Sequence, residues 1–418
     1  MTRASCMPPL FRGRRGLMAA AVMAIFLSPT LAEAAETIPG GYSPDADYRR
    51  GSLVIGSDGN VYRALDAVKA KDPVTAKDAP WQLADVAFDT TLDVPGRFDT
   101  IEKAFAFLAG TTISDSATVT VQVAPGTYEL KGPLAIGHSQ GNRVVLKGSK
   151  DPAKTTLDFG RGGGIVIDDR HAVGLDGMTL RGSQRKDQTA VTVDNGGSLR
   201  ATNVVIEGFD LGIVVDNGSK LVAEKVNIAT DDGAWGVKLD SLSCGRLTDC
   251  RVVRHNADGL GGLSLGFDVE NGATADCRGC SASGWMVGFH SGRSGSLEVW
   301  TSEASGNNWG AAVYLDSTLS VFDSILEKNR ERGLAVHGGS AVLHGCRVRN
   351  NKKFGVTSSC NGLVDFQMEP CLISGHEFGV HSYGGRFHGT MPTFKDNDEN
   401  MNVVFANEKG RNDIFILK

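Results

Sequence analysis

Short runs of alternating apolar and polar residues recur along most of this chain at a nearly fixed spacing. Each run begins with a small residue, continues as a few alternating positions and ends in a polar or glycine-rich turn. The runs recur about every 22–26 residues and start at Gly164, Ala190, Gly212, Gly236, Gly262, Gly288, Gly310, Gly333, Gly355 and Gly379. Self-similarity at a fixed period of this size indicates a repeat architecture.

One repeat has room for three short strands and three turns, but not for a strand, a helix and two loops. In the repeat at Gly212 the three strands are GIVVDNG, SKLVAE and KVNIAT. Alternation predicts that five of its side chains point inward: Ile213, Val215, Leu221, Val226 and Ile228. The sequence therefore predicts an all-β, right-handed parallel β-helix of ten or eleven three-strand rungs. A leucine-rich solenoid is the competing class, but the chain has neither consensus leucines nor a helical period.

One segment ahead of the repeats has the period of an amphipathic helix. In Phe98–Gly110, the side chains of Ile101, Ala104, Phe105 and Leu108 fall on one face. The helix is followed by ATVTVQVAPGTYEL, and this order resembles the start of pectate-lyase-like β-helix proteins. The resemblance implies that the helix caps the open end of a coil spanning residues 97–418, where unpaired strand edges would otherwise invite aggregation.

The first residues have the features of a secretory signal peptide, which we assign to residues 1–34. Arginines precede the apolar run Leu17–Leu27, and Ala32–Ala34 is a small-x-small cleavage site. No later segment is long and apolar enough to span a bilayer. We therefore expect export, no stable membrane insertion after cleavage, and a secreted, periplasmic or cell-surface location.

Residues 41–87 have a different residue pattern from the repeats, and this pattern predicts a small β module. The spacing of Tyr48, Gly51, Tyr62, Pro73 and Trp81 resembles the carbohydrate-binding modules attached to chitinases. The resemblance implies that Tyr48, Tyr62 and Trp81 stack on sugar rings. Tyr42 stands where those modules usually have Trp, and a plain β cap or spacer is the alternative.

Composition narrows the classes of partner. The net charge of −5 gives no basic footprint for nucleic acid. The 53 glycines suit a coil with turns at every corner.

The mature chain keeps seven cysteines, which leaves disulfide pairing open, and the pair Cys277 and Cys280 lacks the partners that a zinc site needs. Composition does not fix the oligomeric state.

In each rung, two positions of the first strand point outward. The second of these carries a ladder of aspartates in the early rungs, followed by Gly266 and Gly292. Such aspartates are typical turn formers, but carboxylate oxygens are also the ligands that Ca²⁺ prefers. We therefore expect either no cofactor or Ca²⁺ at Asp194, Asp216 and Asp240.

The middle rungs gather basic and aromatic residues around the same face. The substrate-binding candidates there are Lys238, His255, Trp309, Arg330 and Lys353. Arginine binds carboxylates in a bidentate manner, and tryptophan stacks on sugar rings. This combination favours an extended, acidic polysaccharide as the partner.

The resemblance to pectate-lyase-like lyases and to the related uronate epimerases implies three catalytic roles. One group neutralises the uronate carboxylate, one removes the C5 proton, and one donates a proton. Our candidates are Arg332 or Arg293, then His337 or His290, then Tyr314, and we expect Tyr314 and His337 to be neighbours one rung apart. The epimerase signature Asp-Pro-His-Asp is absent. A non-catalytic rod that binds glycan is the alternative, and a neutral-glycan hydrolase would need two carboxylates in a cleft.

Overall fold

The computed structural model describes residues 39–76, 80–256, 263–367, 369–404 and 415–417. The predicted signal peptide therefore lies outside the described residues. Residues 39–418 form one compact unit. Among the described residues, no helix has both the length and the apolar character needed to cross a membrane.

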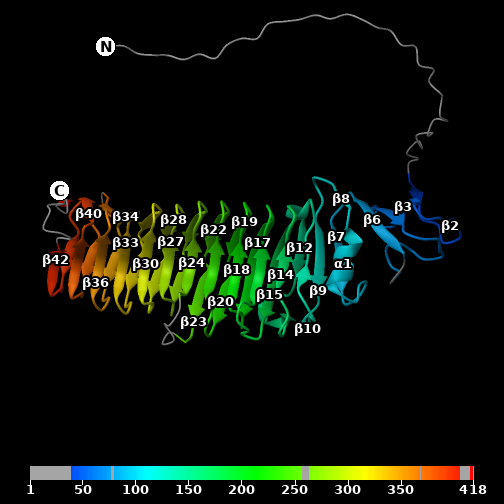
Figure 1. Cartoon of the computed structure of the whole chain (residues 1–418). Coiled ribbons are helices and arrows are strands. Elements are labelled where there is room, and N and C mark those ends of the chain that lie inside the picture. The colour runs from blue at the N-terminus through cyan, green and yellow to red at the C-terminus, as the bar shows by residue number, and fades with distance from the viewer. Residues whose placement is uncertain (1–38, 77–79, 257–262, 368, 405–414, 418) are drawn as a thin grey trace, which may run out of the picture. The chain divides into compact units, whose positions relative to one another are not determined.

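From Thr90 onward the chain winds into a parallel β-helix, as the repeat predicts (Figure 1). One face is a twelve-stranded parallel sheet, two strands more than the ten repeat starts. Its strands are β11 (Leu134–Ala135), β14 (Ile165–Ile167), β16 (Thr189–Val193), β18 (Leu211–Val215), β21 (Trp235–Leu239), β24 (Leu265–Val269), β27 (Val287–Ser291), β30 (Trp309–Tyr314), β33 (Arg332–His337), β36 (Phe354–Ser359), β39 (Phe378–Tyr383) and β42 (Glu399–Val404).

The other two faces belong to a single 24-stranded sheet, because two ten-residue strands bend across both of them. The second face holds β7 (Thr90–Val94), β9 (Val119–Val123), β12 (Val144–Lys147), β15 (Ala172–Arg181), β17 (Ser198–Glu207), β19 (Lys220–Glu224), β22 (Cys244–Thr248), β25 (Thr274–Arg278), β28 (Ser296–Trp300), β31 (Thr318–Phe322), β34 (Ser340–His344), β37 (Leu363–Phe366), β40 (Arg386–Gly389) and β43 (Phe415–Leu417). The third face holds the ends of β15 and β17 with β10 (Gly126–Glu129), β13 (Thr155–Asp158), β20 (Asn227–Thr230), β23 (Arg251–Arg254), β26 (Ser281–Ser283), β29 (Glu303–Ser305), β32 (Ile325–Glu327), β35 (Arg347–Arg349), β38 (Leu372–Ser374) and β41 (Thr393–Lys395). Short 3-10 turns, η1 (Gly141–Arg143) and η2 (Pro152–Lys154), lie near the first rungs.

The apolar side chains of every rung meet in one continuous core. All five inward residues predicted for the repeat at Gly212 are buried there. The helix α1 (Ile101–Leu108) begins after Thr100, whose side chain accepts a hydrogen bond from the backbone amide of Lys103. It buries the four side chains predicted for its apolar face and contacts β7 and β9 of the first rung. The predicted capping helix is therefore present at the N-terminal end of the coil.

A small β region precedes the coil, as predicted. Its five-stranded sheet consists of β1 (Gly40–Gly41), β3 (Leu53–Ile55), β4 (Val61–Ala64), β6 (Trp81–Val86) and β8 (Thr112–Ile113), and β2 (Asp47–Tyr48) pairs with β5 (Val68–Lys69). Strand β6 also contacts α1, so the region packs directly on the capping helix.

Polar ladders inside the turns help to hold the rungs in register. Asn307, Asn329 and Asn351 are almost fully buried and lie one above the other. The side-chain oxygen of Asn329 accepts from Asn307, and its amide donates to Ala304 O and to Asn351 Oδ1 at 3.1 and 2.8 Å. Buried amides that are paired in this way resist slippage, since any shift of register leaves them unsatisfied.

We predict that Asn329→Ala lowers the free energy of unfolding by about 3 kcal/mol, because the buried backbone N–H of Asn307 and the carbonyl of Ala304 lose their hydrogen bonds to the Asn329 side chain. Thermal and chemical unfolding would measure the loss. Within the described residues, the side chain of the half-buried Asn308 makes a single hydrogen bond, 3.4 Å long, to the sulfur of Met286. Asn308→Ala is the matched control, with an expected loss below about 1 kcal/mol. Equal losses for the two variants would contradict the role of the ladder.

Candidate functional site

The outer face of the twelve-stranded sheet carries three rows of side chains that run across strands β21 to β36. The start row is Trp235, Leu265, Val287, Trp309, Arg332 and Phe354. The middle row is Lys238, Asp268, His290, Ala312, Ala335 and Thr357. The end row is Asp240, Glu270, Gly292, Tyr314, His337 and Ser359. These rows contain side chains that can transfer protons, bind metals or carry charge: Lys238, Asp240, Asp268, Glu270, His290, Tyr314, Arg332 and His337.

The structure corrects one repeat of the sequence analysis. The repeat was placed at Gly262, which put Ser264 and Gly266 at the outward positions. In the structure Lys238 pairs with Asp268, and Gly266 is the counterpart of Gly236. The prediction was therefore wrong by four residues, and it missed Asp268 and Glu270. The signal was present, because GFDVENG ends in the same acidic-Asn-Gly turn as GIVVDNG.

Asp268 and His290 form a buried pair in the middle row. The Asp268 carboxylate is 1% exposed and the imidazole of His290 is 6% exposed. His290 Nδ1 lies 2.7 Å from Asp268 Oδ1, a distance at which the ring N–H donates to the carboxylate. The hydrogen bond fixes the orientation of the imidazole, as it does in carboxylate–histidine pairs of many active sites.

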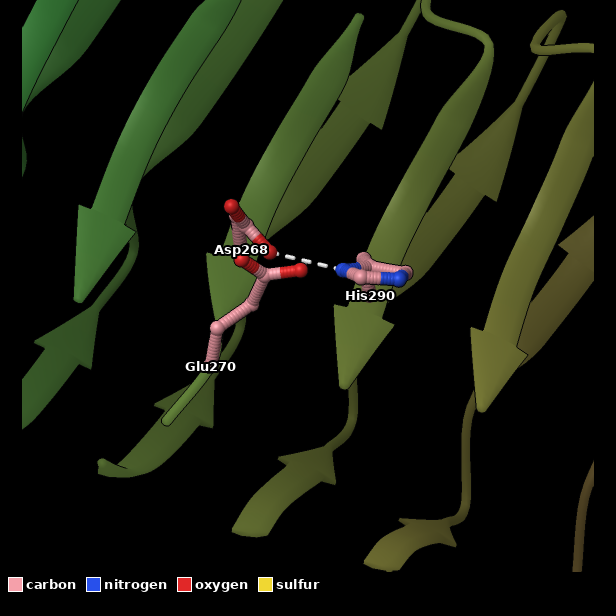
Figure 2. A group of neighbouring side chains, drawn as sticks. All are labelled: Asp268, Glu270 and His290. Carbon is pink, nitrogen blue, oxygen red and sulfur yellow. Dashed lines mark hydrogen bonds and ion pairs between the residues drawn. The ribbon is translucent and has the colours of Figure 1, made fainter. Parts of the chain in front are cut away.

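Glu270 points at this pair from the turn after β24 (Figure 2). Burial raises the pKa of Glu270, and the negative charge of Asp268 raises it further. Arg293, whose Nη1 is 3.5 Å from Glu270 Oε2, opposes this effect. One ligand atom from each of Asp268, Glu270 and His290 lies within 4.8 Å of the other two.

The residue between Glu270 and Tyr314 in the end row is Gly292, which lies beside this group. A Cβ atom at Gly292 would approach His290 Cε1 to 2.9 Å and Glu270 Oε1 to 3.2 Å. Any side chain at this position would therefore press on both groups. Glycine at this position therefore avoids contacts that would displace His290 and Glu270.

Lys238 and Asp240 form an ion pair at the N-terminal side of the site. Lys238 Nζ lies 2.8 Å from Asp240 Oδ2 and 4.8 Å from the centre of the Trp235 ring. Burial alone would lower the pKa of Lys238, but the hydrogen bond to Asp240 and nearby carboxylates raise it overall. The ammonium therefore stays charged at neutral pH.

Tyr314 lies between two histidines on neighbouring rungs, as the sequence analysis expected for His337. Its ring centre is 5.7 Å from that of His290 and 5.6 Å from that of His337. Burial raises the pKa of Tyr314, although the charge of Arg332 opposes the rise. His337 is exposed, and its Nδ1 lies 3.0 Å from Ser359 Oγ. Its Nε2 has no hydrogen-bond partner among the described residues.

Arg332 lies at the other edge of the face, over two aromatic rings of the start row. Its guanidinium carbon is 4.8 Å from the centre of Trp309 and 5.4 Å from that of Phe354. It also pairs with Glu331 at 3.0 Å, and Trp309 donates its indole N–H to Glu331 at 2.8 Å. Lys353 Nζ lies 5.1 Å from the Phe354 ring. Cations and aromatic faces thus alternate along this edge.

The structure does not bring every predicted residue to this face. His255 is exposed in the turn after β23, outside the three rows. Arg330 precedes β33, and its backbone amide bonds to Asn307 O. In the N-terminal region, Tyr62 and Trp81 are 0% and 2% exposed, and Tyr48 packs edge-on against Trp81 at 5.4 Å. The rings of Tyr62 and Trp81 are thus core side chains of the module.

The aspartates predicted as calcium ligands are already engaged in the turns. Asp194 Oδ1 accepts from the backbone amide of Asn195 and from the Asn217 side chain, both at 2.7 Å. Asp216 accepts from the amide of Asn217 at 2.7 Å, and Asp240 bonds to Lys238, Ser241 and Asn271. Neither carboxylate–histidine group compact enough for a metal, within the described part of the chain, includes these three aspartates.

The second of those groups lies at the edge of the second face. It consists of Asp323, His344 and Glu369, of which the two acids are exposed. It has the same residue types as the group in the rows but much more access to water. This makes it a natural comparison for the buried group.

Comparisons with known proteins identify the fold. A family model described as a right handed beta helix region matches residues 264–398. Among solved structures, the catalytic domain of a GH87 α-1,3-glucanase in complex with nigerose has a TM-score of 0.55 at 11% identity, covering 84% of this chain and 70% of that one. A variant of the periplasmic alginate epimerase AlgG has a TM-score of 0.49 at 11% identity, covering 80% and 88%. The Azotobacter vinelandii mannuronan C-5 epimerase AlgE4 A-module has a TM-score of 0.48 at 13% identity, covering 76% and 100%. A search of curated proteins gave no significant match. The right-handed β-helix predicted from the sequence is confirmed.

We predict that Glu270→Gln stabilises the protein increasingly as the pH rises above about 4.5, the ordinary pKa of the group. A raised pKa in the folded state means that folding favours the protonated carboxyl, so its contribution is complete below 4.5 and is lost as Glu270 ionises. Glutamine cannot ionise, so the variant avoids that loss. Unfolding curves measured from pH 4 to pH 8 would show the widening difference. The exposed Glu303→Gln is the control, and a difference that stays constant with pH for Glu270→Gln would contradict the account.

Proposed function

We propose that this protein is an exported carbohydrate-active enzyme that removes the C5 proton from uronate residues of an acidic polysaccharide, as a lyase or a C5-epimerase. One observation carries the proposal. Tyr314 lies beside His337 in the end row, with cationic side chains at both edges of the same face. This combination supplies a base, a donor and carboxylate binding in one place.

The chemistry requires the uronate carboxylate to be neutralised first, because only then is the C5 proton acidic enough to remove. Arg332 at the start row is our first candidate for this role, and Arg293 beside Glu270 is the other. Arginine suits the role because its planar fork matches a carboxylate. Trp309, Lys238 and Lys353 would bind neighbouring sugars along the rows.

Proton transfer is assigned to the end row. His337 accepts the proton as the C5–H bond breaks, and His290 is the alternative base. In elimination, the C4–O bond then breaks and Tyr314 protonates the leaving oxygen. In epimerisation, Tyr314 instead returns a proton to C5 from the opposite face. Tyr314 is protonated at neutral pH and can therefore donate; burial raises its pKa and makes it a weaker acid, and the charge of Arg332 opposes that rise.

A glycoside hydrolase is the second candidate, and Glu270 is the observation that favours it. Its raised pKa suits a general acid, and the carboxylate of Asp268 lies close by. The two candidates give different products, because hydrolysis releases reducing ends without unsaturated sugars and without exchange at C5. A non-catalytic glycan-binding rod would give no product at all.

We predict that the protein catalyses deuterium incorporation at C5, or forms unsaturated ends, when incubated with polyuronates in D₂O. Tyr314→Phe should lower the rate at least ~100-fold, because proton transfer by a positioned side chain contributes that much. Nuclear magnetic resonance and ultraviolet absorbance would measure the two products. Tyr383→Phe, at an exposed tyrosine further along the same face, is the matched control.

Loss of turnover in both tyrosine variants, or full activity in Tyr314→Phe, would contradict the assignment of the donor. Absence of exchange, elimination and hydrolysis across a panel of uronate and neutral glycans would favour the non-catalytic rod.

Export is a separate part of the proposal. Sequencing the N-terminus of the protein recovered outside the cytoplasm should give Ala35 as the first residue, and retention of Met1 would contradict it.

A further inference from the structure

Asp268, Glu270 and His290 place three possible metal-ligand atoms close together, and the proposed reaction does not use this arrangement. Its two acids and one imidazole come from neighbouring rungs and converge from different directions (Figure 2). The ligand atoms lie within 4.8 Å of one another. Atoms bound to one Zn²⁺ at about 2.0–2.2 Å lie at most ~4.4 Å apart, so the group is already near that geometry.

A second observation points to a missing positive charge. Asp268 is 1% exposed, and its Oδ2 has no hydrogen-bond partner in the described part of the chain. The Glu270 carboxylate makes no hydrogen bond among the described residues and has only Arg293, at 3.5 Å, as an ion-pair partner. A buried carboxylate beside a half-buried one, with so few donors, is costly unless a cation joins them.

We propose that Asp268, Glu270 and His290 bind a divalent transition-metal cation such as Zn²⁺ or Mn²⁺. The cation takes the place of the proton between His290 Nδ1 and Asp268 Oδ1, and the neutral imidazole then carries its proton on Nε2. A Cβ atom at Gly292 would press on His290 and Glu270, so glycine at this position leaves these two ligands undisturbed. The inference rests on these residues alone and does not depend on the proposed reaction.

The ligand set decides the class of cation. Ca²⁺ takes six to eight oxygen ligands, and the group offers one imidazole nitrogen and two carboxylates. Imidazole with carboxylate suits first-row transition metals, for which affinity rises from Mn²⁺ towards Zn²⁺ and Cu²⁺. Calcium, the cation considered for the aspartate ladder, is therefore expected to bind here weakly or not at all.

Binding would also change the sign of charge on the face. Asp240, Asp268 and Glu270 oppose Lys238 and Arg293, so these five side chains sum to one negative charge. A divalent cation reverses this to one positive charge, which favours an anionic ligand in the rows. With His290 as a metal ligand, His337 remains as the base beside Tyr314.

Metal binding can be measured on the purified, chelator-treated protein without any glycan. Electron paramagnetic resonance counts free Mn²⁺ during a titration and detects nitrogen coupling from a bound imidazole. We expect one Mn²⁺ per chain, displaced by Zn²⁺ but not by an equal concentration of Ca²⁺. Glu270→Gln and His290→Gln should each weaken binding at least tenfold, and His290→Gln should abolish the nitrogen coupling.

The exposed group Asp323, His344 and Glu369 supplies the matched control, because it has the same residue types. The double variant Asp323→Asn/Glu369→Gln should bind Mn²⁺ as tightly as the wild type. The proposal is overturned if binding is lost in that double variant instead, if Glu270→Gln and His290→Gln bind normally, or if no Mn²⁺ or Zn²⁺ binds. Because the assay contains no glycan, each of these results is separate from success or failure of the proposed reaction.

Discussion

The backbone register between successive rungs is the constraint on which the rest of this structure depends. In a parallel ladder each residue lies against its counterpart one rung away, about 4.8 Å distant. Side chains that are more than twenty residues apart in the chain therefore become neighbours, as Asp268 and His290 do. A shift of one rung by one residue would turn every side chain of that strand to the other side of the sheet. The buried asparagine ladder opposes such shifts, because its amides bond between rungs.

The same register concentrates charge on one outer face. Lys238, Asp268 and His290 follow one another in the middle row, and small residues, Ala312 and Ala335, come next. Trp309 and Tyr314 pack over these alanines, which brings their rings to 6.4 Å although they stand at opposite ends of one strand. Burial of Tyr314 in this packing raises its pKa. The face thus carries both paired charges and aromatic rings, which supports the proposed binding of a charged sugar chain.

Much of the fold and part of the site could be predicted from the sequence. Period-two alternation and the spacing of small residues were sufficient for the strands and the inward residues, and the helical spacing of apolar residues was sufficient for the capping helix. The adjacency of Tyr314 and His337 followed from counting one repeat. Asp268 and Glu270 were missed because a four-residue slip preserves the alternation, and glycines at 262 and 266 both fit the small first position. Only the strand pairing separates the two registers. The burial of Tyr62 and Trp81 could not be predicted either, because tertiary packing decides whether an aromatic ring in a short strand faces the core or the solvent.

The most direct test of the account is a structure of the protein with a bound uronate oligosaccharide. The account predicts a sugar chain lying across the rungs on the twelve-stranded face, with one carboxylate against Arg332 or Arg293. The C5 atom of that sugar should lie about 3–3.5 Å from His337 Nε2, the distance at which a reacting pair is poised. An oligosaccharide bound to another face of the coil, or to the N-terminal region alone, would contradict the account.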